Sequence, residues 1–291
     1  MKCKKLSKRE IASWEKVMNV EYEDSPLSEV LNFDEFSLIA TICSCAAHDE
    51  FERMHAYIQA YSVEMAQDKD NPTFESLLKR AYEHAVTSGD AGSCCNLANM
   101  YHNTTGKGSA EDYAYAIELY ELGASRGDAQ SAVNLGYIYY YGRGVEKDYV
   151  RAYECWSRVA LLEDHPEAYW KLGDLYAGGK GVPKSDWMAW SLYSKAHETA
   201  KGSAFGCRAA HHMADYLLKG IKGQLDPNPD RALRLYNEAE VGYYALIDQG
   251  LTYYQRQLDQ AIEGQRAARD AAQLKHQRIR DGFPDGDWVV F

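Results

Sequence analysis

The chain has 291 residues, of which 46% are hydrophobic and 26% are charged, the balance of a folded rather than a disordered protein. Its formal net charge of −11 argues against a nucleic-acid partner, because binding to a phosphate backbone requires cations that replace released counterions. The same charge argues against a generally anionic membrane surface. The length allows one large domain or two smaller ones.

Residues 1–72 are predicted to form an N-terminal helical cap, with early helices over 7–22 and 33–47. The chain begins MKCKKLSKREIASWEKV, which is basic but lacks the apolar region of a secretory signal. The longest apolar run, over 37–47, is too short to span a bilayer. We therefore expect a cytoplasmic protein.

The seven cysteines show no regular spacing that would indicate a disulfide framework, so we expect reduced thiols. Cys43, Cys45 and His48 superficially resemble a metal cluster. Residues two apart on a helix point roughly 200° away from each other, so both thiols cannot face one zinc ion. We interpret the two cysteines as small buried side chains, and a metal or redox role is the alternative.

Residues 73–250 contain an internal repeat. A leucine or methionine followed by glycine or alanine recurs at Leu97, Leu135, Leu172 and Met213, with spacings of 38, 37 and 41 residues. Two glycines follow each of these positions within about ten residues. A period in this range is typical of a helical solenoid.

A second pattern keeps the same period and marks a second helix in each unit. It consists of an alanine and, four residues later, an aromatic residue, in the pairs Ala116 and Tyr120, Ala152 and Trp156, Ala189 and Tyr193, and Ala232 and Tyr236. Each unit is therefore predicted to contain a first helix, a glycine turn, a second helix and a short turn.

The second unit shows what each position is expected to do. Leu135 and Tyr139 lie on one face of the first helix and are predicted to pack inward. Gly136 lowers helix propensity by about 1 kcal/mol relative to alanine, which favours close approach of another helix at this position. Gly142 ends the first helix and can supply a positive φ. Asp148 is the predicted N-cap of the second helix.

These motifs resemble the Sel-1-like repeat, a relative of the tetratricopeptide repeat. The stretches SAVNLGYIYYYGRGVEKDYVRAYECW and AYWKLGDLYAGGKGVPKSD follow its pattern nearly throughout, whereas 91–128 and 205–250 follow it less closely. The resemblance implies an all-α fold, a right-handed α/α solenoid of helix–turn–helix repeats. It also implies a role as an adaptor.

In related solenoids the first helices line the concave surface. If Leu135 and Tyr139 face the second helix, the opposite face of each first helix forms a polar groove with aromatic anchors, and a merely solvated face is the alternative. The predicted partner-binding residues are Asn96, Asn99, Asn134, Tyr137, Tyr141, Lys171, Asp174, His212 and Asp215. Asn96 and Asn134 occupy equivalent positions, so their amides are candidates for a ladder along an extended peptide.

Residues 251–291 are predicted to form one long C-terminal capping helix followed by an apolar tail. The helix carries a loose apolar stripe that includes Leu258 and Ala268, and a capping helix would give the terminal repeat a polar outer face. The tail, Trp288–Phe291, is expected to dock on this helix; presentation to a partner is the alternative.

The segment TTGKGS at 104–109 resembles a broken phosphate loop, but its glycines align with the repeat turns, so we interpret it as a turn. The sequence shows no constellation that would carry a reaction, and we expect neither a cofactor nor a metal. The predicted function is a non-catalytic scaffold that binds a protein or peptide, as a monomer or weak homo-oligomer. The alternatives are an immunity or inhibitor protein that binds one toxin or enzyme, and a hydrolase acting on cell-wall or peptide substrates.

Overall fold

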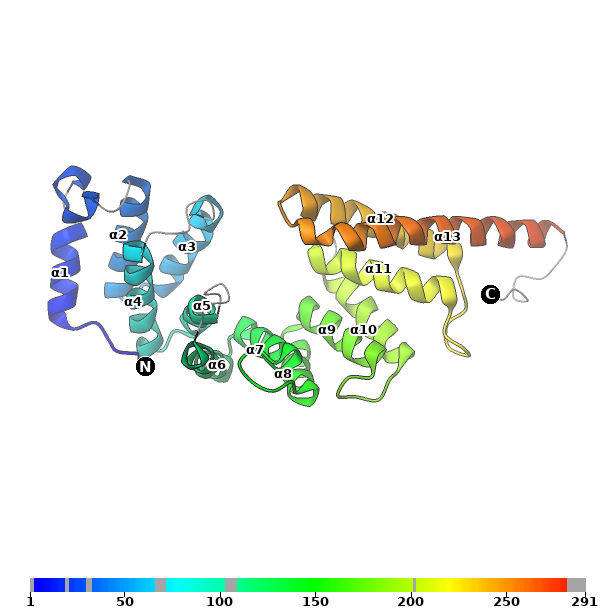
Figure 1. Cartoon of the computed structure of the whole chain (residues 1–291), viewed down its shortest axis with the longest axis horizontal. Coiled ribbons are helices and arrows are strands. Elements are labelled where there is room, and N and C mark those ends of the chain that lie inside the picture. The colour runs from blue at the N-terminus through cyan, green and yellow to red at the C-terminus, as the bar shows by residue number, and fades with distance from the viewer. Residues whose placement is uncertain are drawn as a thin grey trace. The chain divides into compact units, whose positions relative to one another are not determined.

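The computed structural model describes residues 3–18, 21–29, 33–65, 72–102, 109–200 and 203–281, and their secondary structure is helical (Figure 1). The α-helices are α1 (Lys8–Met18), α2 (Phe33–Ala47), α3 (Phe51–Met65), α4 (Pro72–Ser88), α5 (Ala91–His102), α6 (Ala110–Ser125), α7 (Ala129–Tyr141), α8 (Tyr149–Glu163), α9 (Pro166–Gly178), α10 (Asp186–Thr199), α11 (Ala204–Lys219), α12 (Pro229–Asp248) and α13 (Gln255–Arg280). The 3-10 helices are η1 (Tyr22–Asp24), η2 (Pro26–Glu29) and η3 (Thr252–Tyr254). The all-α prediction is confirmed.

The helices form two compact units, Met1–Leu135 and Gly136–Phe291, and the division falls inside α7. The domain boundaries predicted at residues 72 and 250 do not coincide with this division, and they stay predictions.

In the first unit, α2 packs against α1, α3 and α4, while α5 packs between α4 and α6. Its core includes Ile39, Ile42 and Leu97, each at most 1% exposed. Cys43 and Cys45 are buried and free, as predicted for small core side chains. Burial raises the pKa of the Cys43 thiol, which keeps it neutral.

The segment before α1 is held against α4 by polar contacts. The Arg80 guanidinium donates to the carbonyl oxygens of Lys4 and Lys5 and forms an ion pair of 3.0 Å with Glu10. The backbone N–H of Leu6 donates to Nδ1 of His84 over 2.9 Å. These bonds satisfy backbone groups that precede the helix and would otherwise need water.

The repeat turns have the backbone conformation that the sequence predicts. Gly142 and Gly179 follow α7 and α9 with φ of 71° and 62°, a region that L side chains rarely adopt. The Asp148 side chain accepts from the backbone N–H groups of Val150 and Arg151 at the start of α8, both over 3.0 Å. The predicted turn and N-cap are therefore confirmed.

The glycines inside the first helices make room for aromatic rings of the second helices. A Cβ on Gly136 would overlap the indole nitrogen of Trp156, a residue that is fully buried. A Cβ on Gly173 would lie 2.6 Å from Cε1 of Tyr193, closer than atoms in contact can be. The close approach predicted at Gly136 is thus confirmed, and the approaching group is a ring.

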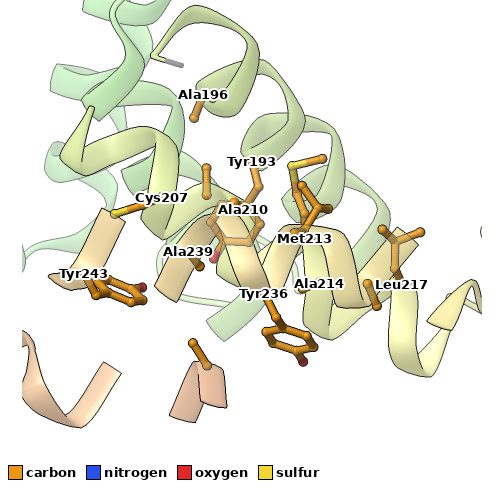
Figure 2. Close-up of a cluster of buried hydrophobic side chains, with 14 of the residues drawn as sticks. Tyr193, Ala196, Cys207, Ala210, Met213, Ala214, Leu217, Tyr236, Ala239 and Tyr243 are labelled. Carbon is orange, nitrogen blue, oxygen red and sulfur yellow. The ribbon is translucent and has the colours of Figure 1, made fainter. Parts of the chain in front are cut away.

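The core of the second unit is formed where α10, α11, α12 and α13 meet. Figure 2 shows Tyr193 from α10, Leu217 from α11, and Tyr236 and Tyr243 from α12 within this cluster of buried side chains. Each of these side chains is at most 2% exposed. The cluster continues into α13 through Leu258, so one apolar layer joins the four helices.

Helix α13 lies along α12 (Figure 1). Leu258, Ala261 and Ala268 on its inner face are buried, and Gln265 donates to the carbonyl oxygen of Tyr236. The apolar stripe predicted for this helix therefore contacts the unit's core. The tail Trp288–Phe291 lies outside the described residues, as do positions 104–108 of the phosphate-loop-like segment.

Candidate functional site

Two positions after the leucine or methionine of each repeat stands a polar residue, and in most repeats its side chain is already hydrogen-bonded within the fold. In three of them, the hydroxyl of the buried second-helix tyrosine donates to this side chain. The pairs are Tyr120 with Asn99 (2.5 Å), Tyr193 with Asp174 (2.9 Å) and Tyr236 with Asp215 (2.5 Å). These groups satisfy hydroxyls inside the fold, and each keeps only part of its acceptor capacity for a partner.

The second repeat replaces this hydrogen bond with a ring contact. Tyr137 occupies the equivalent position, and its ring meets Trp156 edge to face with the centroids 5.5 Å apart. The Tyr137 hydroxyl donates to Glu167 over 2.6 Å, and burial raises its pKa. Tyr141 stacks on Tyr137 at 6.2 Å and is 45% exposed, so it is the more accessible of the two predicted anchors.

The three predicted asparagines lie in the first unit and bond to other side chains. Asn134 Nδ2 donates to Asn99 Oδ1 over 3.3 Å, whereas Asn96 Nδ2 lies 3.3 Å from His55 Nδ1. The amide contact between successive repeats therefore joins Asn134 to Asn99, and Asn96 is not part of it. His55 in turn bonds to Asp90 over 2.8 Å, which extends this polar chain into α3.

Lys171 was predicted to line the partner-binding groove, but it is buried, with only 4% of it exposed. Its Nζ lies 3.3 Å from Asp174 Oδ2 and 4.1 Å from the centroid of the Trp170 ring. Tyr137 and Tyr140 close over it at 5.0 and 5.5 Å. Burial lowers the pKa of this amine, since the charged form loses hydration.

The second unit contains an aromatic cleft with a volume of about 650 Å³. It is lined by Tyr141, Trp170, Arg208, His211, His212, Asp215, Tyr243, Tyr253, Tyr254, Gln257 and Gln260. These residues come from α7, α9, α11, α12, η3 and α13. We call this feature the aromatic cleft. It brings together three of the predicted residues: Tyr141, His212 and Asp215.

Two neighbouring histidines of α11 form part of the cleft wall. The rings of His211 and His212 are nearly parallel, with centroids 6.0 Å apart, and His212 also stacks on Tyr193 at 4.7 Å. His211 is buried and its Nδ1 lies 3.1 Å from the Tyr243 hydroxyl. Burial lowers the pKa of His211, which favours the neutral ring.

Arg208 is the main feature of the cleft that the sequence analysis missed. Its guanidinium carbon lies 4.6 Å from the ring centroids of both Trp170 and Tyr254. Arg208 precedes His212 by one helical turn, as Gln130 precedes Asn134 in the second repeat. Extending the predicted face by one turn would therefore have included it. The α13 and η3 residues carry no repeat signal, so the sequence offered no means of placing them here.

Within the described residues, no group of three or more His, Cys, Asp and Glu side chains is arranged to hold a metal ion. In the same ranges, none of the helices has an apolar stretch of the length needed to cross a bilayer.

A family model described as Sel1 repeat matches residues 91–128, 129–164, 166–196 and 207–239. These four matches coincide with the repeats inferred from Leu97, Leu135, Leu172 and Met213, including the two less regular ones.

Two curated relatives match shorter parts of the chain. It is 33% identical over 86 residues to the ERAD-associated E3 ubiquitin-protein ligase component HRD3B of Arabidopsis thaliana, a match that covers 30% of this chain and 14% of the relative. It is 32% identical over 93 residues to Protein sel-1 homolog 2 of Mus musculus, covering 32% of this chain and 14% of the relative. Each match therefore spans only a small part of the relative.

Two solved structures resemble the chain over most of its length. The protective antigen c5321 of uropathogenic Escherichia coli, which displays an SLR fold, has a TM-score of 0.53 and 22% identity, covering 90% of this chain and 56% of that one. A Sel1 repeat protein from Oxalobacter formigenes has a TM-score of 0.51 and 21% identity, covering 81% and 85%. These likenesses show the fold and confirm the predicted solenoid class.

Proposed function

The chain belongs to the Sel1-repeat family, and we propose that it is a non-catalytic scaffold that binds a protein or peptide through the aromatic cleft. The observation that carries this proposal is the gathering of five tyrosine and tryptophan side chains around one arginine in a cleft of about 650 Å³. Binding energy at protein interfaces concentrates in tyrosine, tryptophan and arginine, especially where they line a pocket.

The cleft is lined by both buried and exposed tyrosine rings. Tyr243 and Tyr254 are 2% and 3% exposed and are held by the core, whereas Tyr141 and Tyr253 are 45% and 65% exposed. Rings fixed by packing lose little conformational freedom when a partner binds, which favours affinity. The exposed rings supply apolar area that a partner can cover.

The family supports a scaffold role. Stacked repeats create extended surfaces for binding other proteins. The Arabidopsis relative is, by its name, a component of an E3 ubiquitin-protein ligase, and thus works within an assembly. The cleft histidines also fit binding better than hydrolysis. His211 bonds to Tyr243 and His212 stacks on Tyr193, and within the described residues neither is bonded to a nucleophile–carboxylate pair.

The proposal is tested with a random peptide library displayed on phage and panned on the full chain. Synthetic versions of the selected peptides are then titrated calorimetrically against three proteins: the wild type, the double variant Tyr141→Ala with Tyr253→Ala, and Tyr244→Ala. Tyr244 is a matched control, since it lies in the same unit, is 48% exposed and does not line the cleft.

We expect the double variant to lose about 2 kcal/mol or more of binding free energy, the usual level for hot-spot residues. The Tyr244→Ala protein should bind like the wild type. Equal affinity of all three proteins for every selected peptide would remove the cleft as the binding site.

A further inference from the structure

We propose that Arg208 is the anchor for one acidic side chain, aspartate or glutamate, in the peptide that occupies the aromatic cleft. This inference rests on the proposed function and names the chemistry of its ligand. It is carried by the position of the guanidinium, by the engagement of the acidic groups around it, and by the charge of the cleft lining.

The guanidinium lies over the rings of two aromatic residues. Trp170 and Tyr254 each have their centroid 4.6 Å from the Arg208 carbon, and Phe205 lies at 5.6 Å. Arginine stacks on aromatic faces in this way and keeps its N–H donors, which lie in the plane of the group, for hydrogen bonding. The aromatic contacts therefore leave the N–H donors of the guanidinium available to a hydrogen-bond acceptor.

The described residues supply no such acceptor. Across the described residues, Arg208 forms neither an ion pair nor a hydrogen bond, although the guanidinium carries five N–H donors. The side chain is only partly exposed. A cation that has lost part of its hydration without gaining a partner is unfavourable, and a bound carboxylate would restore the lost interactions with two parallel hydrogen bonds.

Three carboxylates of α9 and α11 already accept hydrogen bonds from other side chains. Asp215 accepts from Tyr236, Asp174 accepts from Tyr193 and pairs with Lys171, and Glu167 accepts from Tyr137. Among the described residues, none of these three carboxylates forms an ion pair or a hydrogen bond with Arg208. Within the described residues, Arg208 is thus a cation without a direct acceptor, although these three carboxylates keep their charge.

The lining of the cleft points to a single acidic residue rather than a polyanion. Among the described residues that line it, Arg208 is the one arginine or lysine, whereas Asp215 is a fixed acid further along α11. A second acidic group beside Asp215 would be repelled. The aromatic walls instead favour apolar or aromatic residues on either side of the acid.

Trp170, which also lines the cleft, carries a second polar group without a hydrogen-bond partner among the described residues. The indole Nε1 of Trp170 is buried and has no hydrogen-bond acceptor within the described part of the chain. A buried donor without a partner is uncommon in folded proteins. This donor belongs to one of the two rings over which the guanidinium lies.

The test uses the peptides selected on the full-length wild-type chain that lose affinity for the Tyr141→Ala, Tyr253→Ala variant. We expect these cleft-dependent peptides to share an acidic residue at one position. Synthetic peptides with amidated C-termini are then compared with glutamate, glutamine and phosphoserine at that position. The glutamine form should bind at least tenfold more weakly, because it loses a charge-assisted contact.

On the protein side, Arg208→Gln should abolish the difference between the glutamate and glutamine peptides, whereas Arg208→Lys should retain part of it. Arg231→Gln is the matched control, since Arg231 also lies over a tryptophan, Trp190 at 5.8 Å, but lies outside the cleft. Thermal melting by circular dichroism checks each fold. If Arg208→Gln does not fold, the peptide series on the wild type still decides the question.

Cleft-dependent peptides without a shared acid, or equal binding of the glutamate and glutamine forms, would overturn this inference and leave the proposed function standing. Tight binding of phosphoserine with weak binding of glutamate would overturn it in favour of a phosphate ligand. If no selected peptide depends on the cleft, the proposed function itself fails, and the inference fails with it.

Discussion

In the two central repeats, the glycine that follows the repeat leucine is explained by one neighbouring ring. Because Gly136 has no Cβ, the Trp156 indole can occupy the space where a Cβ would be. Gly136→Ala should therefore destabilise the protein by about 1–3 kcal/mol through overpacking, despite a gain in helix propensity of about 1 kcal/mol. Denaturant unfolding measures the difference. Gly178→Ala is the control, because its Cβ would meet only the flexible Lys180 side chain at 3.4 Å; a loss of similar size there would contradict the explanation.

A second residue-scale prediction concerns the recurring tyrosine hydroxyl. Tyr193→Phe removes the donor to Asp174 and keeps the ring in the core. We expect a loss of about 1.5–3 kcal/mol in unfolding free energy, the range for hydrogen bonds to charged groups. Tyr153→Phe is the control, since its hydroxyl lies 3.5 Å from that of Tyr176, too far for a strong bond. Equal costs for the two variants would show that the Asp174 contact adds nothing.

At the scale of elements, the contact between α4 and the N-terminal segment should depend on pH. His84 is 5% exposed, and burial lowers its pKa below 6.5 despite the nearby Asp49 carboxylate; Lys5 and Arg80 lower it further. The unfolded chain therefore binds more protons, so this group's contribution to stability is complete above about pH 6.5 and falls as pH decreases through the folded pKa. Protonation also places a hydrogen on Nδ1, the atom that accepts from the Leu6 N–H.

We expect hydrogen exchange at the Leu6 amide to accelerate on acidification from pH 7 to 5, beyond the intrinsic pH effect on exchange. The variant His84→Phe should remove this added dependence, while His48→Gln, at an exposed position in the same unit, should keep it. The same pH response in the His84→Phe protein would assign the effect to another group.

Helix α13 should be required for the second unit. Its inner face buries Leu258, Ala261 and Ala268 against α12, next to the core tyrosines. Truncation after Gly250 would expose this layer, so melting temperature and solubility should both fall. Truncation after Gln273 removes described residues that are mostly exposed and should have a smaller effect. Unchanged melting after the longer truncation would show that α13 is dispensable for folding.

At the scale of the whole molecule, the periodic positions were predictable and the site was only partly so. Leu135, Gly136, Gly142 and Asp148 follow from a repeat that imposes one local geometry in every unit. Lys171 was predicted to line the partner-binding groove because helical phase gives the direction of a side chain, whereas its burial depends on the rings of Tyr137, Tyr140, Trp156 and Trp170. The cleft also requires η3 and α13, which have no counterpart in the repeat and are positioned only by tertiary packing.

The last prediction follows from the chain's division into two compact units, each of which contains buried apolar side chains. In repeat proteins stability is approximately the sum of terms from each unit and its nearest neighbours. Leu217→Ala removes a side chain that is 1% exposed in the second unit and should cost about 2–5 kcal/mol. Hydrogen exchange resolved by peptide should then show lost protection over α10–α13 and unchanged protection over α2–α5.

The reciprocal variant, Leu97→Ala, should reverse the pattern because Leu97 is buried in the first unit. Uniform loss of protection in both variants would instead mean that the chain unfolds as one cooperative block, with the cleft and the N-terminal helices sharing a single free energy of unfolding.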